Sequence, residues 1–159
     1  MTRRKVFPPT GVHAIFTRRP PYGCERFGTG RQIRPGRAHL MTKILLAEDD
    51  NDMRRFLVKA LQNAGYEVVS YDNGASAYQH LREEPFELLL TDIVMPEMDG
   101  IELARRASEL DPDIKIMFIT GFAAVALNSD SKAPKNAKVL SKPVHLRDLV
   151  NEVQKMLAA

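Results

Sequence analysis

Short apolar runs alternate with longer amphipathic segments from residue 43 to the end of the chain. Five of these runs have the length and the turn-bounded context of buried strands. The predicted strands are Lys43–Ala47, Tyr66–Tyr71, Glu87–Thr91, Lys115–Thr120 and Lys138–Ser141. Because strands and helices alternate, the pattern predicts an α/β domain with a parallel sheet.

The segments between the runs carry apolar residues at i, i+3, i+4 and i+7, which is the spacing of one helix face. The residues expected to face the core are Met53, Phe56, Leu57, Ala60, Leu61 and Ala64, then Ala77, Tyr78 and Leu81, then Leu103, Ala104, Ala107 and Leu110, and last Leu146, Leu149, Val150, Val153 and Met156 or Leu157. Gly65 is suited to end the first helix. Residues 123–127 predict only a short fourth helix, because polar residues and Pro134 follow them.

Polar motifs stand at the carboxyl ends of four predicted strands. They are Glu48-Asp49-Asp50, Thr91-Asp92, Thr120-Gly121 and Ser141-Lys142-Pro143. In an open parallel sheet these strand ends share one edge, where ligands bind. We therefore expect acids, a hydroxyl and an ammonium to meet in one pocket, which suits a divalent cation and a phosphoryl group.

Asp92 is the strongest candidate for a reactive residue, because a carboxylate that ends an apolar strand is costly to bury without compensation. Such a carboxylate can attack phosphorus and form an aspartyl phosphate. A helix or turn cap is the competing interpretation of a lone aspartate, but the other motifs favour the reactive role. Lys142 and Thr120 are expected to bind the phosphoryl oxygens, and Gly121 to let the backbone approach them closely.

Glu48 and Asp49 are expected to hold Mg²⁺ beside Asp92, since Mg²⁺ prefers oxygen ligands in octahedral geometry. The backbone carbonyl of Val94 would complete the ligands from the protein. The alternative role of this acidic segment is to cap the first helix, which we assign to one of residues 50–52. The segment is long enough to serve both purposes.

The charge of the chain is unevenly distributed. Residues 1–40 contain nine Lys or Arg and one acidic residue, a net of +8, whereas residues 41–159 contain 14 Lys or Arg and 19 acidic residues, a net of −5. The first segment also has five Gly, five Pro and no apolar period, so we expect a basic disordered leader followed by a domain over residues 41–159. A misassigned start at Met41, or an inert tail, is the preferred explanation, ahead of an organellar transit peptide or a DNA-binding arm.

The lone cysteine, Cys24, excludes an intramolecular disulfide. No apolar run approaches the roughly 20 residues that span a bilayer. We therefore expect a cytoplasmic protein that neither enters a membrane nor binds nucleic acid.

These motifs, in this order, resemble the receiver domain of two-component response regulators, together with Met95-Pro96 and Asp99-Gly100. The resemblance covers about residue 43 to the C-terminus. It implies a flavodoxin-like, CheY-like sheet in the order 2-1-3-4-5 with five helices. It also implies that Asp92 accepts a phosphoryl group, with Mg²⁺, from a histidine kinase or a histidine phosphotransferase.

One position departs from the family pattern. Receiver domains usually carry Tyr or Phe three residues before the conserved lysine, and this chain has Val139 there. In the family, that aromatic side chain moves inward when the hydroxyl residue moves toward the phosphate. The aromatic half of the switch is therefore missing here.

No output domain is evident after the last predicted helix, so we expect the function to lie in protein contacts. Within the family, the body of the chain is similar to stand-alone receivers that regulate the alphaproteobacterial cell cycle. That similarity implies an adaptor for the ClpXP protease, active when unphosphorylated, and the tail Leu157-Ala158-Ala159 resembles the apolar tails that its unfoldase recognises. An ordinary helix end explains this tail equally well.

Other functions remain as alternatives. A phosphorelay intermediate or a chemotaxis-type switch would use the same receiver. An enzyme of the haloacid-dehalogenase type needs a second aspartate at the position of Val94, and a nucleotide switch needs a Gly-rich phosphate loop that is missing. We therefore expect no enzymatic activity beyond self-phosphorylation and self-dephosphorylation on Asp92.

Overall fold

The computed structural model describes residues 41–128, 130 and 132–159. In this part, strands and helices alternate: β1 Lys43–Ala47, α1 Asn51–Asn63, β2 Glu67–Tyr71, α2 Gly74–Leu81, β3 Leu88–Thr91, α3 Gly100–Leu110, β4 Lys115–Thr120, α4 Ala123–Leu127, β5 Lys138–Ser141 and α5 Leu146–Ala158. The predicted strands are confirmed, with a difference of one residue at the starts of β2 and β3. The predicted leader over residues 1–40, with its Cys24, lies outside the described residues.

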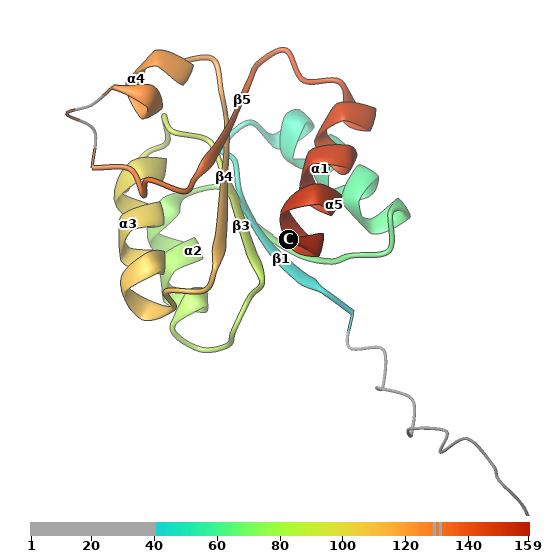
Figure 1. Cartoon of the computed structure of the whole chain (residues 1–159), viewed down its shortest axis with the longest axis horizontal. Coiled ribbons are helices and arrows are strands. Elements are labelled where there is room, and N and C mark those ends of the chain that lie inside the picture. Colours follow the sequence, from blue (N-terminus) through green and yellow to red (C-terminus); the bar gives the residue numbers. More distant parts are fainter. Residues whose placement is uncertain (1–40, 129, 131) are drawn as a thin grey trace, which may run out of the picture. The chain divides into compact units, whose positions relative to one another are not determined.

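All five strands are parallel and form one sheet in the order β2-β1-β3-β4-β5 (Figure 1). β1 lies between β2 and β3, where Leu45 is in register with Val69 on one side and Leu89 on the other. This is the doubly wound order that the family resemblance implied. The carboxyl ends of β1 and β3 are therefore neighbours at one edge of the sheet.

Each face of the sheet has its own apolar core. On one face, Leu57 and Leu61 of α1 and Leu149 and Val153 of α5 pack against alternate strand residues. On the other face the buried helix residues come from α2 and α3, and Figure 1 shows these two helices side by side. The strands of the middle of the sheet are covered on both sides, which explains their continuous apolar sequences.

The helix ends match the signals in the sequence. The side chains of Asp50, Asn73 and Asp99 each accept a hydrogen bond of 2.8 Å from a backbone N–H in the first turn of α1, α2 and α3. Gly65, just after α1, has a φ of +95°, which glycine adopts without strain. Among the described helices, none is both long and apolar enough to cross a membrane.

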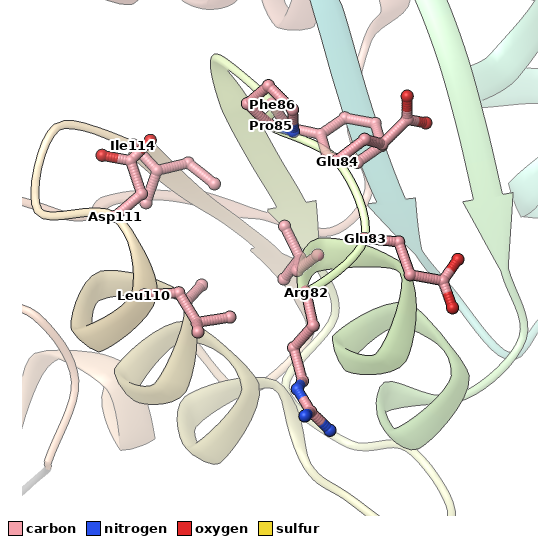
Figure 2. A pocket seen from close by; sticks show the side chains of 10 residues that line it. Arg82, Glu83, Glu84, Pro85, Phe86, Leu110, Asp111 and Ile114 are labelled. Carbon is pink, nitrogen blue, oxygen red and sulfur yellow. The ribbon is translucent and has the colours of Figure 1, made fainter.

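Three residues predicted to face the core are exposed: Phe56, Ala64 and Leu110. Phe56 is 52% exposed, because Leu57 and Leu61 supply the buried stripe of α1. Leu110 is 46% exposed and is the last residue of α3, one turn beyond the buried Ala107. Figure 2 shows Leu110 beside a cavity of about 400 Å³ that it lines together with Ile114. The apolar periodicity of α3 therefore continues past the part of this helix that the sheet covers.

Gly100 lets the start of α3 approach β3. A Cβ atom built on this residue would lie 1.8 Å from the carbonyl oxygen of Asp92, and the Gly100 N–H donates a 2.8 Å hydrogen bond to the carbonyl of Ile93. Any side chain here would push the helix away from the backbone of Asp92. At Gly121, in contrast, a Cβ atom would meet nothing within 4 Å.

Replacing Gly100 with Ala should therefore destabilise the protein by about 3 kcal/mol, because the methyl group overlaps a backbone oxygen that cannot move without displacing β3. The free energy of unfolding in urea measures this loss. Gly121→Ala is the matched control, and its stability should be unchanged or slightly raised. Equal stability of the two variants would contradict the close contact at Gly100.

Candidate functional site

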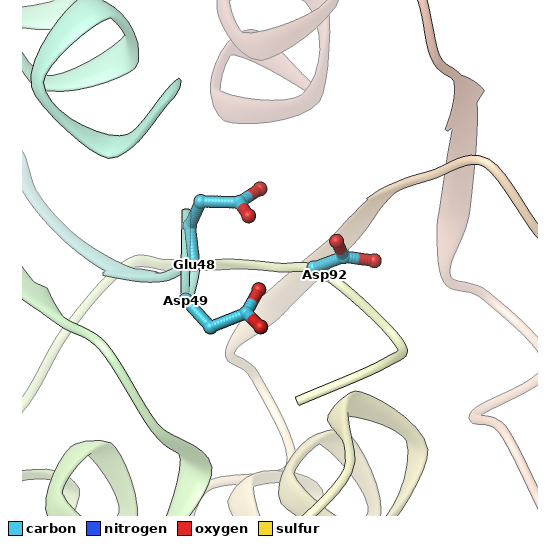
Figure 3. A group of neighbouring side chains, drawn as sticks. All are labelled: Glu48, Asp49 and Asp92. Atoms are coloured by element: carbon cyan, nitrogen blue, oxygen red, sulfur yellow. The ribbon is translucent and has the colours of Figure 1, made fainter. Parts of the chain in front are cut away.

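Three carboxylates meet where β1 and β3 end. The side chains of Glu48, Asp49 and Asp92 each offer an oxygen atom, and these atoms lie within 4.8 Å of one another (Figure 3). Glu48 is only 1% exposed and Asp92 only 8%, whereas Asp49 is exposed to solvent. The structure thus brings together the three acids that the sequence analysis assigned to a metal site.

Backbone hydrogen bonds hold the two buried acids in place. The N–H of Glu48 donates to the carbonyl of Tyr71 in β2 at 3.0 Å, and the N–H of Asp92 donates to the carbonyl of Ala47 in β1 at 3.0 Å. Each acid therefore follows its strand while still paired to the neighbouring strand. The sheet, rather than a loop, sets the distance between the carboxylates.

Lys142 joins the two buried acids. Its Nζ donates to Oδ2 of Asp92 at 2.7 Å and to Oε2 of Glu48 at 2.9 Å. Its backbone N–H donates to the carbonyl of Thr120 at 2.9 Å, and the peptide bond that precedes Pro143 is cis. The sequence analysis placed Lys142 at this edge but did not anticipate that Glu48 would be its second partner.

The pKa values of this group reflect burial and charge together. Burial raises the pKa of Glu48, although the hydrogen bond from Lys142 partly opposes that effect. Burial acts to lower the pKa of Lys142, but the hydrogen bonds and charges of Asp92 and Glu48 outweigh it, so that the net pKa is raised. Lys142 therefore stays cationic. With the three acids ionised, the cluster carries three negative charges and one positive charge.

Both oxygens of the Asp92 carboxylate have partners. Oδ1 accepts a 2.6 Å hydrogen bond from the N–H of Ile93, and Oδ2 accepts the ammonium of Lys142. Asp92 does not cap α3, because Asp99 accepts the hydrogen bond at that helix start. The capping interpretation of Asp92 is therefore wrong for this helix, and its carboxylate is directed into the acidic group.

Thr120 ends β4 at the same edge, and its side chain is buried. Its Oγ accepts a 3.1 Å hydrogen bond from the N–H of Phe122, which itself is exposed. Among the described residues other than its chain neighbours, none lies within 4 Å of a Cβ atom built on Gly121, and the predicted close approach of its backbone to a phosphoryl group stays a prediction. Val94, the predicted carbonyl ligand, lies two residues past Asp92 with an exposed side chain.

Sequence reasoning missed one contributor to the site. Arg54 in α1 donates from Nη1 to the carbonyl oxygen of Glu48 at 2.7 Å, and its Nη2 contacts Oδ1 of Asn51. The guanidinium therefore fixes the peptide that carries the most buried carboxylate. No motif identifies this role, because the contact joins a helix side chain to a backbone atom six residues earlier.

The chain is similar in sequence to a response regulator receiver protein and to part of a sensor kinase. The response regulator receiver protein CpdR of Brucella abortus (strain 2308) is 81% identical over 119 residues, which are 75% of this chain and 99% of CpdR. The sensor kinase CckA of the same organism is 36% identical over 116 residues, which are 72% of this chain but only 12% of the kinase.

Solved structures resemble the fold as well. A response regulator receiver protein from Sinorhizobium medicae WSM419 matches with a TM-score of 0.68 and 28% identity, over 76% of this chain and 97% of that protein. The chemotaxis protein CheY4 of Vibrio cholerae matches with a TM-score of 0.67 and 25% identity, over 73% of this chain and 98% of that protein. The sequence model of the response regulator receiver domain matches residues 44–154. The chain therefore belongs to the response regulator receiver domain family of two-component signalling.

Proposed function

We propose that Asp92 is the phosphoacceptor of a receiver that controls protein contacts. The observation that carries this proposal is the buried Asp92 carboxylate, 2.7 Å from the ammonium of Lys142 and grouped with Glu48 and Asp49. A buried aspartate with one cationic neighbour and two further acids has little structural purpose, since it adds repulsion to the fold. The arrangement suits a carboxylate that attacks the phosphorus of a phosphoryl group.

Mg²⁺ is the cofactor that this group of residues suits. The three carboxylates and Lys142 together leave two negative charges unbalanced, and one divalent cation balances them. Glu48, Asp49 and Asp92 would hold the ion with the carbonyl of Val94, because Mg²⁺ takes oxygen ligands and keeps several waters. When bound, the ion offsets the repulsion between Asp92 and an anionic phosphoryl donor.

The phosphoryl transfer follows from the same residues. An oxygen of Asp92 attacks the phosphorus of a phosphohistidine on a kinase or phosphotransferase; the new O–P bond forms as the N–P bond breaks, and the histidine nitrogen keeps the electron pair. The ammonium of Lys142 then moves from Asp92 Oδ2 to a phosphoryl oxygen. The hydroxyl of Thr120, which accepts a hydrogen bond from the Phe122 N–H, rotates and donates a hydrogen bond to another phosphoryl oxygen. Water later cleaves the acyl phosphate, and no other enzymatic activity is proposed.

The output is a change in binding to other proteins in the cytoplasm. Phosphorylation shifts an existing equilibrium between two surface states, and α4, β5 and α5 form the surface that reports it. Two features support this assignment: α4 has five residues and no side-chain cap, and it packs directly beside β5. Val139 of β5 is partly buried against the core, so the switch operates without the usual aromatic side chain.

Delivery of substrates to the ClpXP protease is the specific output that we propose. The 81% identity to the response regulator receiver protein CpdR, over 99% of that protein, supports this proposal. The unphosphorylated form would be the active adaptor. A phosphorelay intermediate is the second candidate, supported by the similarity to CckA, and a chemotaxis-type switch is the third.

Asp92→Asn should abolish incorporation of phosphate from a phosphohistidine donor or acetyl phosphate, because the amide cannot attack phosphorus. Phosphate-affinity electrophoresis measures the modified fraction. Asp113→Asn is the matched control, since Asp113 is exposed beyond α3 at the opposite edge of the sheet. If the Asp92→Asn protein still becomes phosphorylated, the phosphoacceptor is a residue other than Asp92.

Mg²⁺ should raise the melting temperature, because it binds the folded site and not the unfolded chain. At a free concentration about one hundredfold above Kd, the expected gain in unfolding free energy is about 2.7 kcal/mol. Asp49→Asn should remove most of this gain, and Asp113→Asn should keep it. If all three proteins respond equally to Mg²⁺, the ion does not bind at the acidic group.

The adaptor function can be tested with the full chain, ClpXP and candidate substrates of the protease. Substrate loss should be faster when the unmodified protein is present, and a phosphodonor with Mg²⁺ should suppress this effect. With Asp92→Ala, the phosphodonor should have no influence, since the acceptor oxygen is gone. If the chain never accelerates degradation but passes phosphate to a second histidine protein, the phosphorelay function replaces the adaptor.

A further inference from the structure

A groove with a basic lining runs between α1 and β2. Its volume is about 490 Å³, and its cationic side chains are Arg54, Arg55 and Lys59. Val58 of α1 and Ser70 of β2 also line it. Of the described residues that form the groove, none is acidic, although the domain that carries it has a net charge of −5.

Arg55 and Lys59 of this groove differ from the paired cations of α3 and α5. Arg105 and Arg106 of α3 both pair with Glu102, and Lys155 of α5 pairs with Glu152. Arg55 and Lys59 are exposed, and the described residues provide no ion pair for either of them. They stand four residues apart on one helix face, where like charges repel.

A direct contact connects the groove to the acidic site. Arg54 lines the groove and also donates to the carbonyl of Glu48 at 2.7 Å. Glu48 contributes a carboxylate to the group that includes Asp92. A ligand that binds the Arg54 guanidinium therefore competes with the hydrogen bond that holds Glu48.

We propose that this groove binds an acidic segment of a partner protein, and that its occupancy is coupled to the Mg²⁺ site through Arg54. Carboxylates of the segment would pair with Arg55 and Lys59 and draw Arg54 away from Glu48. The binding stands on the charge of the groove alone, while the coupling rests on the proposed Mg²⁺ site. Mg²⁺ and the acidic segment then weaken each other's binding by the same factor.

The surroundings favour a peptide over a nucleic acid. Nucleic-acid surfaces extend their positive charge over a face or along a helix, so that several phosphates are neutralised. Here the basic side chains occupy one short groove. The acidic residues Glu48 and Asp49 lie just before the start of α1, next to the end of the helix that adjoins the acidic site. A long phosphate backbone would meet this negative charge, whereas a short acidic segment fits within the groove.

Binding can be measured by fluorescence anisotropy with a short labelled peptide of alternating Glu and Gly, without Mg²⁺. The full-length wild type should bind it, and combined Arg55→Glu and Lys59→Glu substitutions should weaken binding at least about tenfold, because each reversal turns an attraction into a repulsion. Lys115→Glu combined with Lys135→Glu changes the net charge by the same amount outside the groove, and this charge-matched control should bind like the wild type. Equal weakening by both variants, or preference for a single-stranded oligonucleotide over the peptide, would overturn the proposal.

The coupling needs a second comparison, because Mg²⁺ also screens charge and binds free carboxylates. Mg²⁺ should weaken peptide binding several-fold more in the wild type than in Asp49→Asn, which experiences the same screening. In Arg54→Met this excess should vanish, whereas in Arg55→Met it should persist. If melting curves show that Mg²⁺ binds the wild type, an equal effect of Mg²⁺ on peptide binding in the wild type and in Asp49→Asn would overturn the coupling. If Mg²⁺ does not shift the melting curve of the wild type, the Mg²⁺ site itself is refuted.

Discussion

The contact of one ammonium with two buried carboxylates organises this protein. Glu48 and Asp92 are almost fully removed from water, and like charges that are buried so close together repel strongly. The Nζ atom of Lys142 lies within hydrogen-bonding distance of both carboxylates and places a positive charge between them. One cation cannot balance three ionised acids, so the site retains excess negative charge.

The backbone makes this arrangement possible. Glu48, Asp92 and Lys142 each donate their own N–H to a residue of the adjacent strand, so each charged residue continues the ladder of the sheet. The charged residues are thus tied to the hydrogen-bonded backbone of the sheet, which limits how far they can separate to relieve their repulsion. Gly100 adds to this constraint, because α3 begins in direct contact with the backbone of Asp92.

The regions around the site differ in how firmly they are held. β1, β3 and β4 are covered on both faces, whereas α4 is short and lacks a side-chain cap. Thr120 lies at the boundary, since its backbone belongs to β4 while its hydroxyl contacts the N–H of Phe122 just before α4. If this hydroxyl gains a new hydrogen-bond partner, the first helix to be displaced would therefore be α4. On the other side, Arg54 links the site to α1 through the peptide of Glu48.

The fold and the residues that group at the strand ends could be predicted from the sequence. Its apolar runs located the strands to within one residue, and the motifs at the strand ends named Glu48, Asp49, Asp92, Thr120 and Lys142, because a parallel sheet brings its carboxyl ends to one edge. Local patterns report only on local geometry, so they misplaced Phe56, which adjoins the buried stripe of α1, and Leu110, which lies where the sheet no longer covers α3. Three contacts became apparent only from the packed fold: Lys142 bridges Glu48 as well as Asp92, Gly100 touches the Asp92 carbonyl, and Arg54 holds the peptide of Glu48. Those contacts depend on distances between separate elements, and such distances are set when the whole core packs.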